Sequence, residues 1–167
     1  MAITFTPRLD DSGMKNSVYW YSGNLFSQSG YGLPNCTTYA WGRQYEILGK
    51  PPTWLGLGNA KEWYPYAQDV TPQLCGKTPK LGAILCTYYS VGGHVAVVEQ
   101  INEDRSIVVS QSGYGSKTYF WTETLYPPYL ASWAKDREGA YVQGFIYLTE
   151  DIVDPTQGVT FKRWTSN

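Results

Sequence analysis

The second half of the chain contains short runs rich in β-branched, aromatic and other apolar residues, at 82–89, 94–101, 106–112, 117–121 and 141–148. Only a few residues separate the first four runs, and these include Gly, Ser, Asn and Asp, which favour tight turns. Consecutive strands joined by such short turns lie antiparallel. This pattern therefore predicts an antiparallel meander in the second half of the chain.

Two helical patterns precede these runs. Small or apolar residues keep helical spacing from Cys36 to Leu48, and Gly49 predicts the end of that helix. A second helix is expected within 58–69, where Asn59 and the Glu three residues later have the spacing of a capping box. Pro65 is expected to shorten this helix to a turn or two. Helices followed by an antiparallel sheet predict an α+β fold, with N-terminal helices packed on a C-terminal sheet.

The length of 167 residues suits one well-buried core and is too short for two ordinary domains. Residues 1–150 are expected to form that single domain, and about the first thirty of them are expected to be mostly irregular. Residues 151–167 lack an amphipathic period, which predicts a linker or tail.

The composition argues against several classes of partner. A net charge of −1 gives no basic field for nucleic acid or an anionic membrane surface. No run approaches the roughly 20 apolar residues of a membrane span, so no membrane insertion is expected. Aromatic residues make up 16% of the chain. They fit either an exposed surface that stacks on flat or sugar-like ligands or an aromatic-rich β core, and both alternatives stay open.

Two of the three cysteines, Cys75 and Cys86, are expected to be reduced packing residues. Metal-type CxxC pairs are absent from the sequence, so neither a zinc site nor any other cofactor is expected.

Cys36 and His94 are the candidates for nucleophilic chemistry. Cys36 follows a loop rich in Gly and Pro and begins the first predicted helix, where free N–H groups and the helix dipole favour a thiolate and a lowered pKa. His94, the only histidine, begins a predicted strand directly after Gly92 and Gly93, so it can project into a cleft and accept a proton. Each residue alone has a plainer explanation, as a packing cysteine or a surface or core histidine. Together they suit a Cys/His pair of the papain-like arrangement.

The chain resembles the CHAP domain, the cysteine- and histidine-dependent amidohydrolase/peptidase module of phage endolysins and bacterial wall hydrolases. The resemblance covers roughly residues 18–148. It is carried, in the family's order, by "GLPNCTTYAWGR", by "LGKPPTWLG" leading into "LGNAKEWY", by "PKLGAILC", and by "GGHVAVVEQI" followed by "SIVVSQSGY". It implies a papain-like fold and the hydrolysis of amide bonds in peptidoglycan.

By this resemblance Cys36 matches the nucleophile and His94 the base. The family usually places an acidic or amide residue as the third member on the next strand, in a pattern like S-E-x-N, and here Gln111 replaces the Glu and Gly113 the Asn. A Gln carbonyl can hold the imidazole tautomer but cannot stabilise imidazolium as a carboxylate would. Glu99 is the competing candidate, although on a regular strand it faces the side of the sheet opposite His94.

The resemblance also suggests residues around the substrate. Asn35 is either an oxyanion-stabilising donor or a helix cap. Tyr114 matches a cleft-lining aromatic residue, with a buried core tyrosine as the alternative. Arg43 is expected to be structural. Residues 25–35, where some family members bind calcium, contain no carboxylate, so no metal is expected there.

The sequence thus predicts a peptidoglycan hydrolase, either an N-acetylmuramoyl-L-alanine amidase or an endopeptidase. Since "MAITFTPRLDDSG" lacks a secretion signal, we expect a phage lysin that stays in the host cytoplasm until it is released to the wall. It is expected to be a monomer, and a wall-binding domain could follow residue 167. The alternatives are a non-catalytic wall-binding module, which the replacements at Gln111 and Gly113 would favour, and a cysteine peptidase that acts on proteins.

Overall fold

The computed structural model describes residues 2–154 and 159–161. Its elements in chain order are β1 (Ile3–Thr4), α1 (Leu25–Gln28), α2 (Cys36–Leu48), α3 (Ala60–Val70), the 3-10 helix η1 (Pro72–Leu74), β2 (Cys75–Gly76), β3 (Ile84–Tyr88), β4 (His94–Ile101), β5 (Ile107–Gly113), β6 (Thr118–Leu125), the 3-10 helix η2 (Ser132–Ala134), β7 (Tyr141–Ile146), β8 (Ile152–Asp154) and β9 (Val159–Phe161).

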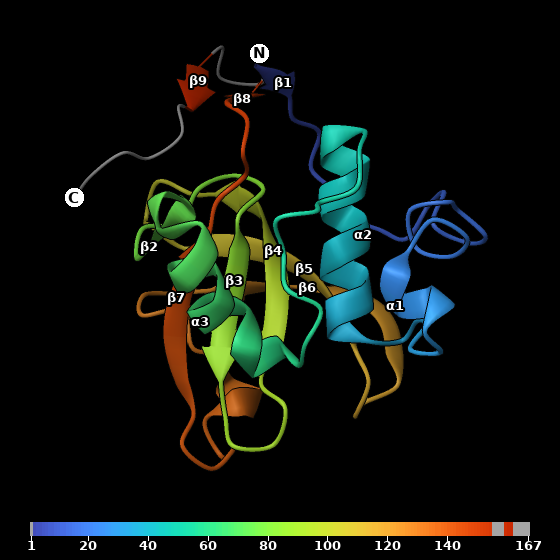
Figure 1. The fold of residues 1–167 in the computed structure, drawn as a ribbon. Helices are drawn as coiled ribbons and strands as arrows, with labels where there is room; N and C mark the ends of the chain where they lie inside the picture. Colours follow the sequence, from blue (N-terminus) through green and yellow to red (C-terminus); the bar gives the residue numbers. More distant parts are fainter. Residues whose placement is uncertain (1, 155–158, 162–167) are drawn as a thin grey trace.

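Six strands form an antiparallel sheet in the order β2-β7-β3-β4-β5-β6. Helices α2 and α3 lie on the same face of this sheet, with α2 over β4 and β5 and α3 over β3 and β7 (Figure 1). Between helices and sheet lies a core that includes the fully buried Trp20, Trp41 and Trp63. This is the α+β, papain-like arrangement that the sequence predicts, with N-terminal helices on a C-terminal antiparallel sheet.

The opposite face of the sheet is covered by the segment between β6 and β7. Tyr129, Ala131 and Ala134 of this segment are buried against the sheet residues Val98 and Val109. The central strands are therefore buried on both faces, which fits their nearly continuous apolar sequences.

Helix α2 begins and ends where its sequence predicts. Asn35 has extended backbone and caps the N-terminus, and Gly49 ends the helix in the left-handed conformation, with φ of 72°. A glycine adopts this conformation without the steric cost that a side chain would add.

Helix α3 is longer than predicted, because Pro65 does not end it and the helix continues to Val70. Pro65 has no N–H to donate to the carbonyl of Lys61 one turn earlier. That carbonyl instead accepts a hydrogen bond from Gln143 Nε2 on β7, at 3.1 Å. A side chain from a distant strand thus compensates for the proline.

The two ends of the domain meet in a second, small sheet of order β1-β8-β9. Strand β8, which lies within the segment expected to be a linker or tail, pairs in parallel with β1, Ile152 opposite Ile3. The other parts of that segment, 155–158 and 162–167, lie outside the described residues. Among the helices that the structure describes, none combines the length and apolar character needed to cross a bilayer.

Candidate active site

Cys36 is the first residue of α2, and two contacts fix the start of that helix. Asn35 Oδ1 accepts hydrogen bonds from the Thr37 N–H at 3.2 Å and from Thr37 Oγ1 at 2.9 Å. The Asn35 N–H donates to Ser112 Oγ on β5, at 3.1 Å. The helix start is therefore attached to β5 at Ser112, the residue after Gln111.

The thiol of Cys36 lies against the beginning of β4. Strand β4 pairs with β5 from Val97 and Ser110 onward, so the first residues of β4 are not part of that ladder. The backbone N–H groups of Val95, Thr37 and Cys36 face the sulfur and favour its thiolate form. Because Val95 directly follows His94, the thiol lies beside the strand residue that is next to the candidate base in the chain.

Burial raises the pKa of the Cys36 thiol to about 11. The backbone N–H donors of Val95, Thr37 and Cys36 act in the opposite direction but with a smaller effect. The prediction of a lowered pKa is therefore wrong for the free protein. The helix start supplies the expected donors, but desolvation of the thiolate outweighs them.

Two glycines set the position of His94 at the start of β4. The Gly92 carbonyl accepts a hydrogen bond from the Lys61 N–H at the start of α3, at 2.9 Å. Gly93 has φ of +74°, and a Cβ there would lie 2.7 Å from Lys61 N. Only a residue without a side chain lets the loop close against α3 in this way, and the loop in turn delivers His94 to the site.

The His94 imidazole is buried between two tryptophans and an amide. Trp121 stacks on it with ring centroids 6.2 Å apart, and Trp133 meets it edge-on at 4.9 Å. Its Nε2 lies 2.9 Å from Gln111 Oε1. Burial lowers the pKa of His94 to about 4, against the opposing effects of the Gln111 hydrogen bond and the Glu123 carboxylate.

The two pKa values determine the resting state of the pair. With the thiol pKa well above neutrality and the imidazole pKa well below it, both groups are neutral at pH 7. A preformed thiolate–imidazolium pair is therefore not the resting state.

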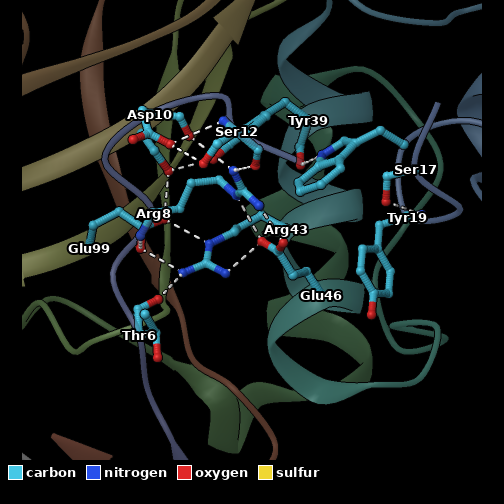
Figure 2. Close-up of polar contacts among 12 residues, drawn as sticks. Thr6, Arg8, Asp10, Ser12, Ser17, Tyr19, Tyr39, Arg43, Glu46 and Glu99 are labelled. Carbon is cyan, nitrogen blue, oxygen red and sulfur yellow. Dashed lines mark hydrogen bonds and ion pairs between the residues drawn. The ribbon is translucent and has the colours of Figure 1, made fainter. Parts of the chain in front are cut away.

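Glu99, the competing third residue, lies on the helix-covered face of the sheet, where it meets Arg43 and Arg8 (Figure 2). Its carboxylate accepts from Arg43 Nε at 2.9 Å and from Arg43 Nη2 at 2.8 Å, and also from Ser110 Oγ at 2.6 Å. It further accepts the Arg8 N–H at 2.9 Å. This buried ion pair joins α2 to β4, which gives Arg43 the structural place expected for it.

The two predicted substrate residues lie at the edge of the site. Asn35 uses its side-chain oxygen as the helix cap, and its amide NH2 group is not required for that role. Tyr114, in the β5–β6 hairpin, is 72% exposed, so the buried-core alternative is wrong. Tyr31, in the loop before Cys36, is also exposed. The chain therefore has both an aromatic core, which includes Trp20 and Tyr39, and exposed aromatic surface at Tyr31 and Tyr114.

Glu123 and the two tryptophans around His94 were not among the predicted site residues. Glu123 Oε1 accepts from Gln111 Nε2 and from Trp133 Nε1, both at 2.9 Å. The predicted strand ended at Trp121, whereas β6 continues to Leu125. Trp121 pairs with Gln111, so strand alternation places Glu123 on the same face as that glutamine.

The other two cysteines are free thiols that pack in or against the helix-side core. Within residues 2–154 and 159–161, no three His, Cys, Asp or Glu side chains gather in a way that could hold a metal ion.

Comparison with known proteins gives one family. The model of the CHAP domain matches residues 26–113. The probable autolysin LDP of Staphylococcus aureus is 39% identical over 106 residues, which is 64% of this chain and 35% of that protein. The staphylococcal secretory antigen SsaA of the same organism is 34% identical over 113 residues, which is 68% of this chain and 40% of that protein. The chain thus spans two fifths or less of the length of these curated relatives.

A solved structure, N-acetylmuramoyl-L-alanine amidase from Staphylococcus aureus, is 25% identical and aligns over 66% of this chain and 31% of its own, with a TM-score of 0.47. The span matched by the family model runs from α1 to the end of β5 and contains Cys36, His94 and Gln111. The chain therefore belongs to the CHAP domain family.

Proposed function

We propose that this CHAP domain is a peptidoglycan hydrolase that cleaves an amide bond of the bacterial cell wall with Cys36 as nucleophile and His94 as base. One observation carries the proposal. The Cys36 sulfur faces the backbone of Val95, the residue after His94, while Gln111 Oε1 lies 2.9 Å from His94 Nε2. Membership of the family and a relative named as an autolysin support peptidoglycan as the substrate.

In the proposed reaction His94 takes the Cys36 proton as the sulfur attacks the carbonyl carbon. The tetrahedral intermediate collapses when the resulting imidazolium delivers that proton to the leaving amine, which breaks the C–N bond and leaves a thioester on Cys36. Water, deprotonated by His94, then attacks the thioester. The acid is released and the proton returns to the sulfur, so the enzyme regains its neutral resting pair.

We propose that two donors stabilise the oxyanion. They are the backbone N–H of Cys36 and the side-chain NH2 of Asn35, whose oxygen is already engaged as the helix cap. Tyr114 and Tyr31 are exposed on the loops next to the site, and aromatic faces of this kind suit stacking on sugar rings. We propose that these two tyrosines contact the glycan or the peptide of the wall.

The first experiment measures the loss of turbidity of purified Gram-positive cell walls. We expect lysis by the wild type, none by Cys36→Ala, and unchanged lysis by Cys75→Ala, the matched control in which a cysteine outside the site is removed. Walls from several species must be tried before the absence of lysis counts against the proposal. Free muramic-acid ends in the digest would identify an amidase, and new amino termini within the peptides an endopeptidase.

The same assay separates the alternatives. A wall-binding module would bind walls without lysis, and a peptidase that acts on proteins would digest unfolded protein in preference to walls. The replacement of the family's carboxylate by Gln111 is the observation in favour of a binding module. The origin in a phage, expected from the sequence, stays a prediction.

A further inference from the structure

Behind Gln111, on the side away from His94, lies the carboxylate of Glu123. The Gln111 side chain is buried and uses both ends of its amide, with its oxygen 2.9 Å from His94 Nε2 and its nitrogen 2.9 Å from Glu123 Oε1. The same Glu123 oxygen accepts the indole N–H of Trp133, at 2.9 Å. Glu123 is thus held by two donors and points at the amide, not at the imidazole.

The donors and acceptors of Glu123, Gln111 and His94 determine how the Gln111 amide is oriented and which nitrogen of the imidazole carries the proton. An ionised carboxylate can only accept hydrogen bonds, so Glu123 must face the NH2 end of the Gln111 amide. The carbonyl end must then face His94. A carbonyl also only accepts, so the Nε2 of His94 must carry a proton, which leaves the lone pair of the neutral imidazole on Nδ1.

We propose that Glu123 is a positioning residue that, through Gln111, selects the Nε2–H tautomer of His94 and leaves Nδ1 as the base for Cys36. This inference rests on the proposed function of Cys36 and His94. Without Glu123 the Gln111 amide could rotate by half a turn and present its NH2 group to the imidazole. His94 would then accept at Nε2 and carry its proton on Nδ1, where it could not remove a proton from the thiol.

Glu123 also supplies the negative charge that a glutamine cannot. Two charged side chains act on the pKa of the imidazole, Glu123 from β6 and Arg137 after η2. Tyr89, after β3, lies against Arg137 and Trp133 and is neutral below its raised pKa. Glu123 favours imidazolium and Arg137 opposes it. The carboxylate that would balance imidazolium is therefore present one amide away from the ring.

Two substitutions of similar size separate these roles in the full chain. Glu123→Gln removes the charge but keeps an oxygen that accepts from Gln111 and Trp133. Glu123→Met removes the acceptor altogether. Glu103→Gln, at an exposed carboxylate elsewhere, is the matched control.

Because His94 is the only histidine, the imidazole nitrogens give one unambiguous set of nitrogen-15 NMR signals. At pH 7.5 we expect the Nε2–H tautomer in the wild type, in Glu103→Gln and in Glu123→Gln, and a mixture of tautomers in Glu123→Met. We also expect Glu123→Met to lower kcat for wall hydrolysis roughly 10-fold or more with little change in KM. Glu123→Gln should cause a smaller decrease.

A wild type with its proton on Nδ1, or a Glu123→Met variant with the wild-type tautomer, would overturn the inference. Absence of wall hydrolysis by the wild type would instead count against the proposed function, since the NMR spectra report the tautomer without any substrate.

If Glu123→Met does not fold, the exchange variant Gln111→Glu with Glu123→Gln takes its place. Its carboxylate accepts directly from Nε2, so the tautomer should persist and the pKa of His94 should rise measurably above that of the wild type. A pKa that stays the same or falls would refute the role of Glu123.

Discussion

Acidification should destabilise this domain through His94. The folded protein holds the pKa of His94 at about 4, while the ordinary value is 6.5. A base with a lowered folded pKa contributes stability that is fully present above the unfolded pKa and is lost as the pH falls toward the folded one. Each pKa unit corresponds to about 1.36 kcal/mol, so the whole difference is about 3 kcal/mol. Between pH 7.5 and pH 4.5 the expected loss is about 2 to 3 kcal/mol.

The measurement is urea unfolding at both pH values, followed by tryptophan fluorescence, for the wild type and for His94→Gln. The variant lacks the titrating imidazole, so the carboxylates contribute equally to the pH dependence of both proteins, and the difference between the two pH effects isolates His94. We expect the free energy of unfolding of the wild type to fall by about 2 to 3 kcal/mol more than that of the variant. An equal decrease in both proteins would refute the argument that His94 is buried in its neutral form.

Three further predictions concern the groups around the site. Gly93→Ala should cost roughly 1–3 kcal/mol of stability, because φ there is +74° and the new Cβ meets the start of α3. The substitution should also lower kcat, because it displaces His94. Urea unfolding measures the first effect and wall turbidity the second. Gln111→Ala should reduce turnover much more than Glu99→Ala, and a larger loss of turnover in Glu99→Ala would contradict the assignment of the third residue. Glu99→Ala should instead cost about 3 kcal/mol of stability, because it removes the fully buried carboxylate that binds Arg43 and leaves that guanidinium only the half-buried Glu46 as an ionic partner. Wall lysis should be unaffected by a calcium chelator, because residues 25–35 contain no carboxylate. A loss of lysis that added calcium restores would contradict this prediction.

Local signals explain why the sequence predicted some elements well. The bounds of α2 follow from a cap at Asn35 and a glycine at Gly49, and both act within one turn of the helix. Side chains alternate between the two faces of the sheet along β4, so the placement of Glu99 and His94 on opposite faces likewise follows from one strand alone. Such features need no knowledge of distant residues.

The features that the sequence analysis missed depend on partners far away in the chain. Pro65 is tolerated in α3 because Gln143, on β7, supplies the missing donor. The raised pKa of Cys36 arises from burial, which exists only once helix and sheet have packed. Glu123 reaches Gln111 through the register of β5 with β6, which includes an irregularity after Gln111. A register that depends on such an irregularity cannot be counted from strand alternation alone.

Two carboxylates on opposite faces of the sheet hold the two halves of the candidate catalytic pair. Glu99 lies on β4, five residues after His94, and binds Arg43, which lies on α2 two turns after Cys36. This ion pair therefore attaches helix α2, which bears the thiol, to strand β4, which bears the imidazole. Glu123, on the other face, acts on the imidazole through Gln111. Since neither carboxylate can replace the other across the sheet, loss of Glu99 should appear mainly as lost stability. Loss of Glu123 should appear as a changed tautomer and a lower kcat in a protein that remains folded.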